Sequence, residues 1–377
     1  MIRTSTLKKL ELKKVLEDVA EYSQSVSAKN MILSTLPEVD SNKVKRLLDE
    51  TDEAVKLINF YNVSPGFNFD SVREIADKAK ILSTLSMKEL LYVKRILSTS
   101  RSVSNAFSGV EDEEIFLLRQ YTSMIYCNRS VEESIEFAVI SEDEMNDRAS
   151  DELYRIRTAI RRTNDEIKQK LNSYLHSSSI SKYMQDSLIT VREQRYVIPV
   201  KTEYKSYVPG LIHDQSASGA TVFIEPMAIV NLNNKLKELY IDEKNEIERI
   251  LTEFTSEISK FSDRLKENEN ILAYLDAVFS KAKYANDTRC TMPIVNDKGY
   301  IDIRNGRHPL IEKDKVVPIS VRLGSGYNIL LITGPNTGGK TVSLKTVGLF
   351  VLMAGCGLML PCSRDSEISV FDNIFCD

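Results

Sequence analysis

The sequence is poor in the residues that build metal centres and disulfide frameworks. It has three histidines and five cysteines, and the cysteines show no C-x-x-C spacing. So few histidines make a histidine-based metal site improbable. The cysteine pattern predicts no disulfide scaffold and suits a reducing, cytoplasmic compartment.

A strong charge of one sign and a long apolar run are also missing. The net charge is −4, so the protein as a whole does not attract nucleic acid, and any such binding requires a local patch. The uncharged stretch "TVGLFVLMAGCGLML", residues 346–360, is about five residues too short to cross a membrane. No apolar run follows the early lysines, so we expect no signal peptide. A chain of 377 residues with 42% hydrophobic and 28% charged residues has room for two or three globular domains.

The most specific motif is "LLITGPNTGGKTVSLKT", residues 330–346. It fits the phosphate-loop pattern G-x-x-x-x-G-K-[ST], and the apolar run Ile329–Ile332 before it predicts a buried strand. In such a loop, backbone N–H groups surround phosphate oxygens, the lysine reaches the β- and γ-phosphates, and the hydroxyl binds Mg²⁺. The motif predicts an ATP site with Mg²⁺ formed by Gly334, Pro335, Asn336, Thr337, Gly338, Gly339, Lys340 and Thr341. Lys340 and Thr341 have the catalytic roles, and Thr341 is the predicted metal ligand.

Two long helical seams flank a strand-like segment. Helical patterns with breaks at proline and glycine fill residues 5–140 and predict a compact helical domain. Apolar residues at three-four spacing then run from Leu153 to Tyr174 and again from Ile229 to Leu265. Helices roughly 35 to 75 Å long at 1.5 Å per residue would extend from a compact domain as arms.

The strand-like segment between the arms is rich in β-branched and aromatic residues, with turn signals at Pro209-Gly210 and Ser218-Gly219. We call residues 188–228 the tip. The tip carries Arg192, Arg195, Lys201 and Lys205 among tyrosines, a mixture that suits phosphate contact and base stacking. Because Glu193 and Glu203 partly cancel this charge, a solvated hairpin surface is the alternative.

The order of these segments and their amino-acid sequences resemble those of a known family. The residues that carry the resemblance are "LELKKVLEDVA", "ITVREQRYVIPVKTEY", "HDQSASGATVFIEP", "NNKLKELYIDEKNEIERIL", "GRHPLIE" and "ITGPNTGGKTVSLKTVGL". The chain resembles the MutS-type DNA mismatch-repair ATPases, and most closely their second bacterial type, the endonuclease and recombination-suppressor MutS.

The resemblance implies a multidomain fold. It would have a mainly α-helical core, long lever helices, a small β-containing clamp and a truncated α/β P-loop ATPase domain of the ABC type. The implied segments are a core at 1–142, a lever at 143–187, the tip or clamp at 188–228, a returning lever at 229–286 and the incomplete ATPase domain at 287–377.

The resemblance also implies partners and further site residues. Members of this branch act on branched or recombining DNA through an ATP-gated clamp, as homodimers, and some act on stalled ribosomes and their rRNA. Mismatch reading by an inserted aromatic side chain is not implied, because the chain opens directly on the helical core. The family's adenine-contacting positions correspond to Val316 and Val317, although Ile319 stands where the family usually has Asn.

The expected activity depends on sequence beyond Asp377. Family members continue to an acidic Walker B strand, a signature loop and a nuclease domain of the Smr type. Here "ISVF" is followed by Asp372 but by no second carboxylate, so we expect the Walker B strand to be missing. Loss of a general base or a metal carboxylate typically lowers a rate by two or more orders of magnitude.

Two hypotheses follow. The first is a P-loop ATPase that closes a clamp on DNA or structured RNA and suppresses recombination, with endonuclease activity only when the C-terminal part is present. The second is a catalytically inactive module that binds nucleic acid or protein. A coiled-coil chromosome-organising ATPase is disfavoured, because its phosphate loop would precede the coil.

Overall fold

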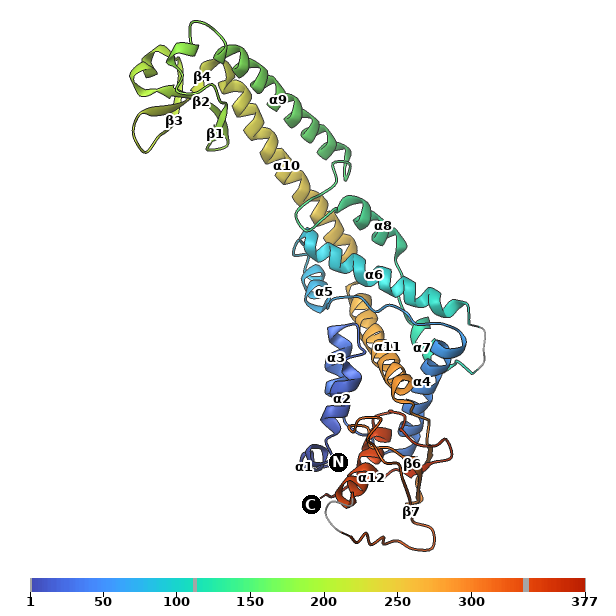
Figure 1. Ribbon diagram of the computed structural model, residues 1–377. Coiled ribbons are helices and arrows are strands. Elements are labelled where there is room, and N and C mark those ends of the chain that lie inside the picture. The colour runs from blue at the N-terminus through green and yellow to red at the C-terminus, as the bar shows by residue number, and fades with distance from the viewer. Residues whose placement is uncertain (1, 111–113, 335–338, 377) are drawn as a thin grey trace. The chain divides into compact units, whose positions relative to one another are not determined.

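The computed structural model describes residues 2–110, 114–334 and 339–376, and its contacts divide the chain into two compact units (Figure 1). Unit 1 comprises Met1–Asp77, Tyr92–Glu132 and Phe261–Asp377, and unit 2 comprises Lys78–Leu91 and Glu133–Lys260. The fold is mainly helical, with one small four-stranded sheet in each unit. A multidomain, mainly helical fold is therefore confirmed, whereas the five predicted segment boundaries stay a prediction.

Helices fill the first part of the chain. They are α1 (Thr4–Lys9), α2 (Leu12–Ala20), α3 (Val26–Leu33), α4 (Ser41–Phe60), α5 (Arg73–Lys80), α6 (Met87–Ser108), α7 (Leu117–Ser123) and α8 (Arg129–Ala138). Buried carboxylates fix several helix starts within unit 1. Glu53 of α4 accepts hydrogen bonds from the backbone N–H groups of Phe116, Leu117 and Leu118 at the start of α7, at 3.1, 2.9 and 2.8 Å. The carboxylate satisfies N–H groups that have no partner inside a helix.

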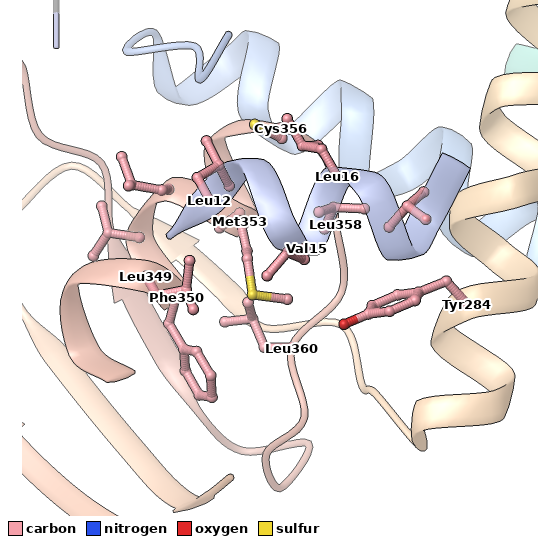
Figure 2. Close-up of a cluster of buried hydrophobic side chains, with 14 of the residues drawn as sticks. Leu12, Val15, Leu16, Tyr284, Leu349, Phe350, Met353, Cys356, Leu358 and Leu360 are labelled. Atoms are coloured by element: carbon pink, nitrogen blue, oxygen red, sulfur yellow. The ribbon is translucent and has the colours of Figure 1, made fainter. Parts of the chain in front are cut away.

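The main core of unit 1 joins segments from both ends of the chain. Helix α12 (Lys340–Gly355) packs against α2 and against α11 (Ser262–Thr288), and Figure 2 shows Leu12, Val15 and Leu16 facing Leu349 and other α12 side chains. These side chains are almost fully buried. Because each such burial contributes roughly 1.5 to 3 kcal/mol, α12 is firmly anchored in unit 1.

Two long helices form the body of unit 2. They are α9 (Asp151–Leu175) and α10 (Met227–Ser259), and α10 is about 50 Å long at 1.5 Å per residue. Figure 1 shows them side by side. The predicted seam on α9 is confirmed: Leu153, Ile156, Ile160, Thr163, Ile167 and Leu171 are buried, and Tyr174 is partly buried.

The second predicted seam is divided between two helices. Residues 260 and 261 separate α10 from α11, and the backbone of Phe261 is not helical, with φ −130° and ψ 20°. The Phe261 side chain is buried, and its ring centroid lies 5.4 Å from that of Tyr126. Because this contact joins residues far apart in the sequence, the local apolar spacing could not indicate where the helix ends.

The sheet of unit 2 lies in the tip. Strands β1 (Thr190–Arg192), β2 (Arg195–Lys201), β3 (Gly210–Gln215) and β4 (Thr221–Pro226) are antiparallel, in the order β1-β2-β4-β3. The short 3₁₀ helices η1 (Ser181–Tyr183) and η2 (Thr202–Tyr207) lie before and within the tip. The predicted turn at Ser218-Gly219 joins β3 to β4, and Gly219 has φ +73°.

The sheet of unit 1 has the order β5-β8-β6-β7. Its strands are β5 (Ile294–Asn296), β6 (Ile301–Gly306), β7 (Ile319–Leu323) and β8 (Glu367–Ser369); β5 and β8 are parallel, whereas β6 pairs antiparallel with β7 and β8. The prediction of a buried strand at 329–332 is wrong for this structure. No strand is assigned there, and Ile329 and Leu331 are 86% and 83% exposed. A strand is stabilised by pairing with another strand, and none of the described strands pairs with this run.

None of the five cysteines forms a disulfide among the described residues. Among the described residues, no helix has both the length and the apolar character that crossing a membrane requires.

Candidate nucleotide and nucleic-acid sites

The predicted phosphate loop ends at the first turn of α12. Gly334 and Gly339 have φ +139° and +78°, in the region of backbone space that residues with a side chain rarely adopt. Gly339 immediately precedes the helix, and Lys340 and Thr341 are its first two residues. Ser343 donates from its backbone N–H and its hydroxyl to the Gly339 carbonyl, at 2.9 and 3.0 Å. The first N–H groups of a helix favour an anion, so this end of α12 suits phosphate.

The side chains at this helix start are accessible. Thr341 is exposed and Lys340 is half-buried. The remaining residues of the predicted site, Pro335, Asn336, Thr337 and Gly338, lie outside the described residues. Their assignment to the ATP site stays a prediction, as do the roles of Lys340 and Thr341.

The opposite end of α12 is held by the helical core of unit 1. Lys281 of α11 donates from Nζ to the Cys356 carbonyl at 2.8 Å, and Thr51 of α4 donates from Oγ1 to the Gly357 carbonyl at 2.8 Å. Both side chains are buried, and burial lowers the pKa of Lys281. Donors at this position satisfy carbonyls left free at the end of a helix. The helix that follows the phosphate loop is therefore fixed at its far end by α4 and α11, and the sequence alone did not indicate either contact.

The predicted adenine contacts lie just before β7. Val317 is 79% exposed and Val316 is half-buried. The Val316 backbone N–H donates to the Glu312 carbonyl at 3.0 Å. An exposed apolar side chain is open to a ligand, and the adenine role of the two valines stays a prediction.

His308 is buried in the same unit. Its Nδ1 accepts a hydrogen bond from the Leu310 backbone N–H at 3.3 Å, and burial lowers the pKa of the imidazole. This hydrogen bond gives His308 a structural role.

Strand alternation separates the two faces of the tip sheet. Tyr196, Ile198 and Val200 of β2 face the apolar core of unit 2, so Arg195 and Lys201 project from the opposite face. Arg192 pairs directly with Arg195 in the β1–β2 register. Three of the four predicted nucleic-acid-binding cations therefore lie on one face, and the fourth, Lys205, lies on η2.

Arg195 is committed to a buried polar network. Its guanidinium donates to Glu225 Oε1 at 2.7 Å and to the Asn234 side chain at 2.6 Å. Glu225 is completely buried, lies 2.6 Å from His213 Nε2 and accepts from Asn233 Nδ2 at 2.8 Å. A buried carboxylate requires such partners. The network joins β2, β3 and β4 to α10.

The other three cations are more available. Arg192 forms an ion pair with Asp214 at 3.1 Å, and its Cζ lies 4.4 Å from the centroid of the Phe223 ring. Lys201 is half-exposed and Lys205 is exposed, and neither forms an ion pair with any described residue. The phosphate-binding role of all four stays a prediction, but their freedom to contact a ligand differs.

A cluster of tyrosines beside these lysines was not found by sequence reasoning as a unit. Tyr183 of η1 lies against Tyr204 and Tyr207 of η2, with ring centroids 5.2 and 5.1 Å away. Lys182 Nζ lies 4.9 Å from the centroid of the Tyr183 ring. Tyr183 lies before the segment that the sequence predicts to bind nucleic acid. The only feature of the sequence that could have pointed to it is the neighbouring Lys182.

Comparison with known proteins finds similarity both in the segment that contains the phosphate-loop pattern and over nearly the whole chain. The family model described as MutS domain V matches residues 330–377, which contain the phosphate-loop pattern and α12. The chain is 47% identical over 372 residues to "Endonuclease MutS2" of Clostridium perfringens (strain SM101 / Type A), covering 98% of this chain and 47% of that protein. It is 44% identical over 377 residues to "Endonuclease MutS2" of Clostridium botulinum (strain Okra / Type B1), covering 100% of this chain and 48% of that protein.

The chain thus spans about half the length of the relatives it matches, and its match to them runs from the first helices to the segment after α12. Because the likeness includes the helical core, the tip and the phosphate-loop motif together, the chain belongs to the MutS family, and within it to the MutS2 type.

Proposed function

We propose that this chain is the ATP-binding and DNA-binding part of a MutS2-type clamp protein. The observation that carries the proposal is the placement of Lys340 and Thr341 at the open end of α12, directly after a glycine with φ +78°. The helix start provides N–H groups for phosphate. Its other end is anchored by Lys281 and Thr51, so α12 links the proposed phosphate site to the helical core.

In this proposal each residue has a defined task. Backbone amides from Pro335 to Thr341 surround the phosphates, Lys340 contacts the γ-phosphate, and the Thr341 hydroxyl is a ligand of Mg²⁺. The Mg²⁺ ion, when bound, neutralises charge that develops on the phosphate oxygens. Val316 and Val317 contact the adenine ring. These residues provide nucleotide binding, and the proposal concerns that step of the ATPase cycle.

We propose branched or recombining DNA as the nucleic-acid partner, with the tip as its contact, and a homodimer as the acting form. Suppression of recombination and action on ribosomes and rRNA belong to the proposal for the full-length protein, and so does the endonuclease activity that the names of the relatives state.

The test of the proposal is the affinity for ATP of the Lys340→Ala variant. Charge-assisted hydrogen bonds contribute about 1.5 to 3 kcal/mol, so the Kd for a fluorescent ATP analogue with Mg²⁺ should rise about 10- to 100-fold. The matched control is Lys298→Ala, because Lys298 is an exposed lysine in the turn between β5 and β6 of the same unit. Circular dichroism of both variants should match the wild type. Equal affinity of wild type and Lys340→Ala would refute the assignment.

One observation favours a second function, an interaction module that does not bind nucleotide. The apolar side chains of Ile329 and Leu331, just before the loop, are almost fully exposed and belong to no strand. Exposed apolar patches often mark contacts with other chains. The same titration decides: a wild-type chain that is folded but does not bind the analogue would favour the module.

A further inference from the structure

The tyrosine cluster brings together one ring from η1, just before the tip, and two rings from η2, within the tip. The rings of Tyr183 and Tyr207 are stacked, with centroids 5.1 Å apart and an interplanar angle of 23°. Tyr204 lies against both, with centroids 5.2 Å from Tyr183 and 6.2 Å from Tyr207. We call these three residues the tyrosine platform.

The platform is held in place from below. Tyr183 and Tyr204 pack against the apolar core of unit 2. The residue after Tyr183, Met184, is buried and forms an antiparallel bridge with Val200 of β2. The next backbone N–H, of Gln185, donates to the Pro199 carbonyl at 3.0 Å. Two of the three rings are therefore fixed by the fold before any ligand binds, which lowers the entropic cost of stacking on them.

The outer ring is open. Tyr207 is 60% exposed, although one side of its ring is stacked on Tyr183. Tyr207, unlike Tyr183 and Tyr204, does not pack against the apolar core of unit 2. A planar ligand can therefore extend the stack on the free side of Tyr207.

The charges nearby suit a phosphate next to that ligand. Lys182 lies over Tyr183, and Lys205 occupies the same short helix as Tyr204 and Tyr207. Neither lysine forms an ion pair within the part of the chain that the structure describes. The same segments also carry Glu203 and Asp186, so the excess of positive charge is small. Stacking, more than charge, would then decide what binds.

We propose that the tyrosine platform binds an unpaired base of DNA, stacked on Tyr207, while Lys182 and Lys205 contact the adjoining phosphates. Bases in a continuous duplex already stack on their neighbours and do not present a free face, whereas unpaired bases do. The platform would give the tip a preference for DNA with single-stranded segments over continuous duplex. This inference rests on the proposed function, since it requires that the tip bind DNA.

The absence of tryptophan from the sequence allows a direct test. In the Tyr207→Trp variant the platform carries the only indole, whose fluorescence is quenched when a base stacks on it. The matched control is Tyr154→Trp on α9, a position that is 44% exposed and outside the tip. A 20-nucleotide single strand of DNA should quench the indole at 207 and leave the indole at 154 unchanged. A 20-base-pair duplex should quench neither.

Affinity gives the second measurement, made with fluorescein-labelled DNA and the wild-type chain, Tyr207→Ala and Tyr207→Phe. Base–aromatic stacking predicts that Tyr207→Ala weakens single-strand binding about 5- to 100-fold. Duplex binding should stay within about twofold, and Tyr207→Phe, which keeps the ring, should bind as the wild type does.

The outcomes separate the two proposals. If the single strand binds but neither quenches the indole at 207 nor responds to Tyr207→Ala, the platform is refuted and DNA binding by the tip survives. If neither DNA binds the wild-type chain, the DNA-binding part of the proposed function fails, and the platform fails with it.

Discussion

At the scale of single residues, Glu11 shows how one side chain connects the N-terminal helices to the phosphate-loop helix. It accepts hydrogen bonds from Lys14 at 2.6 Å and from Lys345 of α12 at 3.1 Å. These two lysines, Lys14 first, lower the pKa of Glu11 from 4.5 to about 2. The charged form of Glu11 is therefore favoured in the folded protein.

This shift predicts a pH-dependent effect of Glu11→Gln. Because the folded pKa is lower than the unfolded one, the stabilisation by Glu11 is fully present above about pH 4.5 and is lost as the pH falls toward about 2. The variant should lose about 1 kcal/mol or less of unfolding free energy at pH 7, as expected for a partly exposed ion pair. Urea unfolding at pH 7, 5, 4 and 3 should show the difference from the wild type shrinking. A difference that is constant with pH would contradict the explanation.

A control for general loss of charge is Glu17→Gln, because Glu17 forms an exposed ion pair with Lys13 at 3.6 Å. Its effect at pH 7 should be smaller than that of Glu11→Gln.

Residue types alone could not indicate which of the four cations of the tip are free to contact a ligand. Composition places Arg192, Arg195, Lys201 and Lys205 in one short segment, and a period of two puts Arg195 and Lys201 on one face of β2, whereas the place of Arg192 on that face depends on the β1–β2 register. The buried partner of Arg195, however, is Glu225, thirty positions later. Such a partner becomes visible only once the register of β2 with β4 is known. The sequence therefore predicts where the charges lie but not which of them are already paired.

At the scale of elements, the helices with periodic apolar residues were predictable. The helix ends and strands that depend on contacts between distant residues were not. The seam on α9 follows from its three-four spacing, because burial of one helix face requires that spacing. Just after the end of α10, Phe261 makes a contact with the distant Tyr126 that local spacing could not indicate. The apolar run at 329–332 matched the pattern of a buried strand, yet the structure assigns no strand there. Apolar character gives a strand its propensity, but pairing with a neighbour gives it its hydrogen bonds.

The end of α12 is also set by one residue, Gly357. Its φ is +70°, its N–H donates to the Ala354 carbonyl at 2.9 Å, and the Leu358 N–H donates to the Met353 carbonyl at 3.0 Å. This pair of bonds defines a helix end that requires a left-handed residue. A Cβ at Gly357 would also lie 2.7 Å from Leu47 Cβ and 3.1 Å from the Leu47 carbonyl oxygen.

Gly357→Ala should therefore destabilise unit 1 by about 2 kcal/mol or more, since left-handed strain of about 1 to 2 kcal/mol adds to the clash with α4. The matched control is Gly109→Ala, because nothing lies within 4 Å of a Cβ built there. The control should change the free energy of unfolding, measured in urea, by less than about 1 kcal/mol. Equal effects of the two substitutions would show that the end of α12 does not depend on this glycine.

At the scale of the whole molecule, the two proposed binding sites belong to different compact units. The phosphate-loop motif and α12 lie in unit 1, and the tip lies in unit 2. The chain passes between the units after Asp77, Leu91, Glu132 and Lys260. Any effect of ATP on DNA binding at the tip must therefore pass from unit 1 to unit 2. The sequence indicated both sites, because each depends on a local motif, but the grouping of distant segments into units depends on tertiary packing.

The separation predicts that the charge of the tip can be changed without affecting the nucleotide site. We expect the triple variant Arg192→Gln, Lys201→Gln and Lys205→Gln to weaken DNA binding and to flatten its dependence on salt. Because each duplex phosphate contact contributes about −0.9 to the slope of log K against log salt concentration, each lost contact should make this slope less negative by about 0.9. The control variant removes the same charge from exposed lysines of α10 in the same unit, Lys235, Lys237 and Lys244. If the tip is the contact, the tip variant changes the slope and the α10 variant does not, while the affinity of both for the ATP analogue equals that of the wild type. A slope that changes only in the α10 variant would move the DNA-binding surface from the tip to the arm.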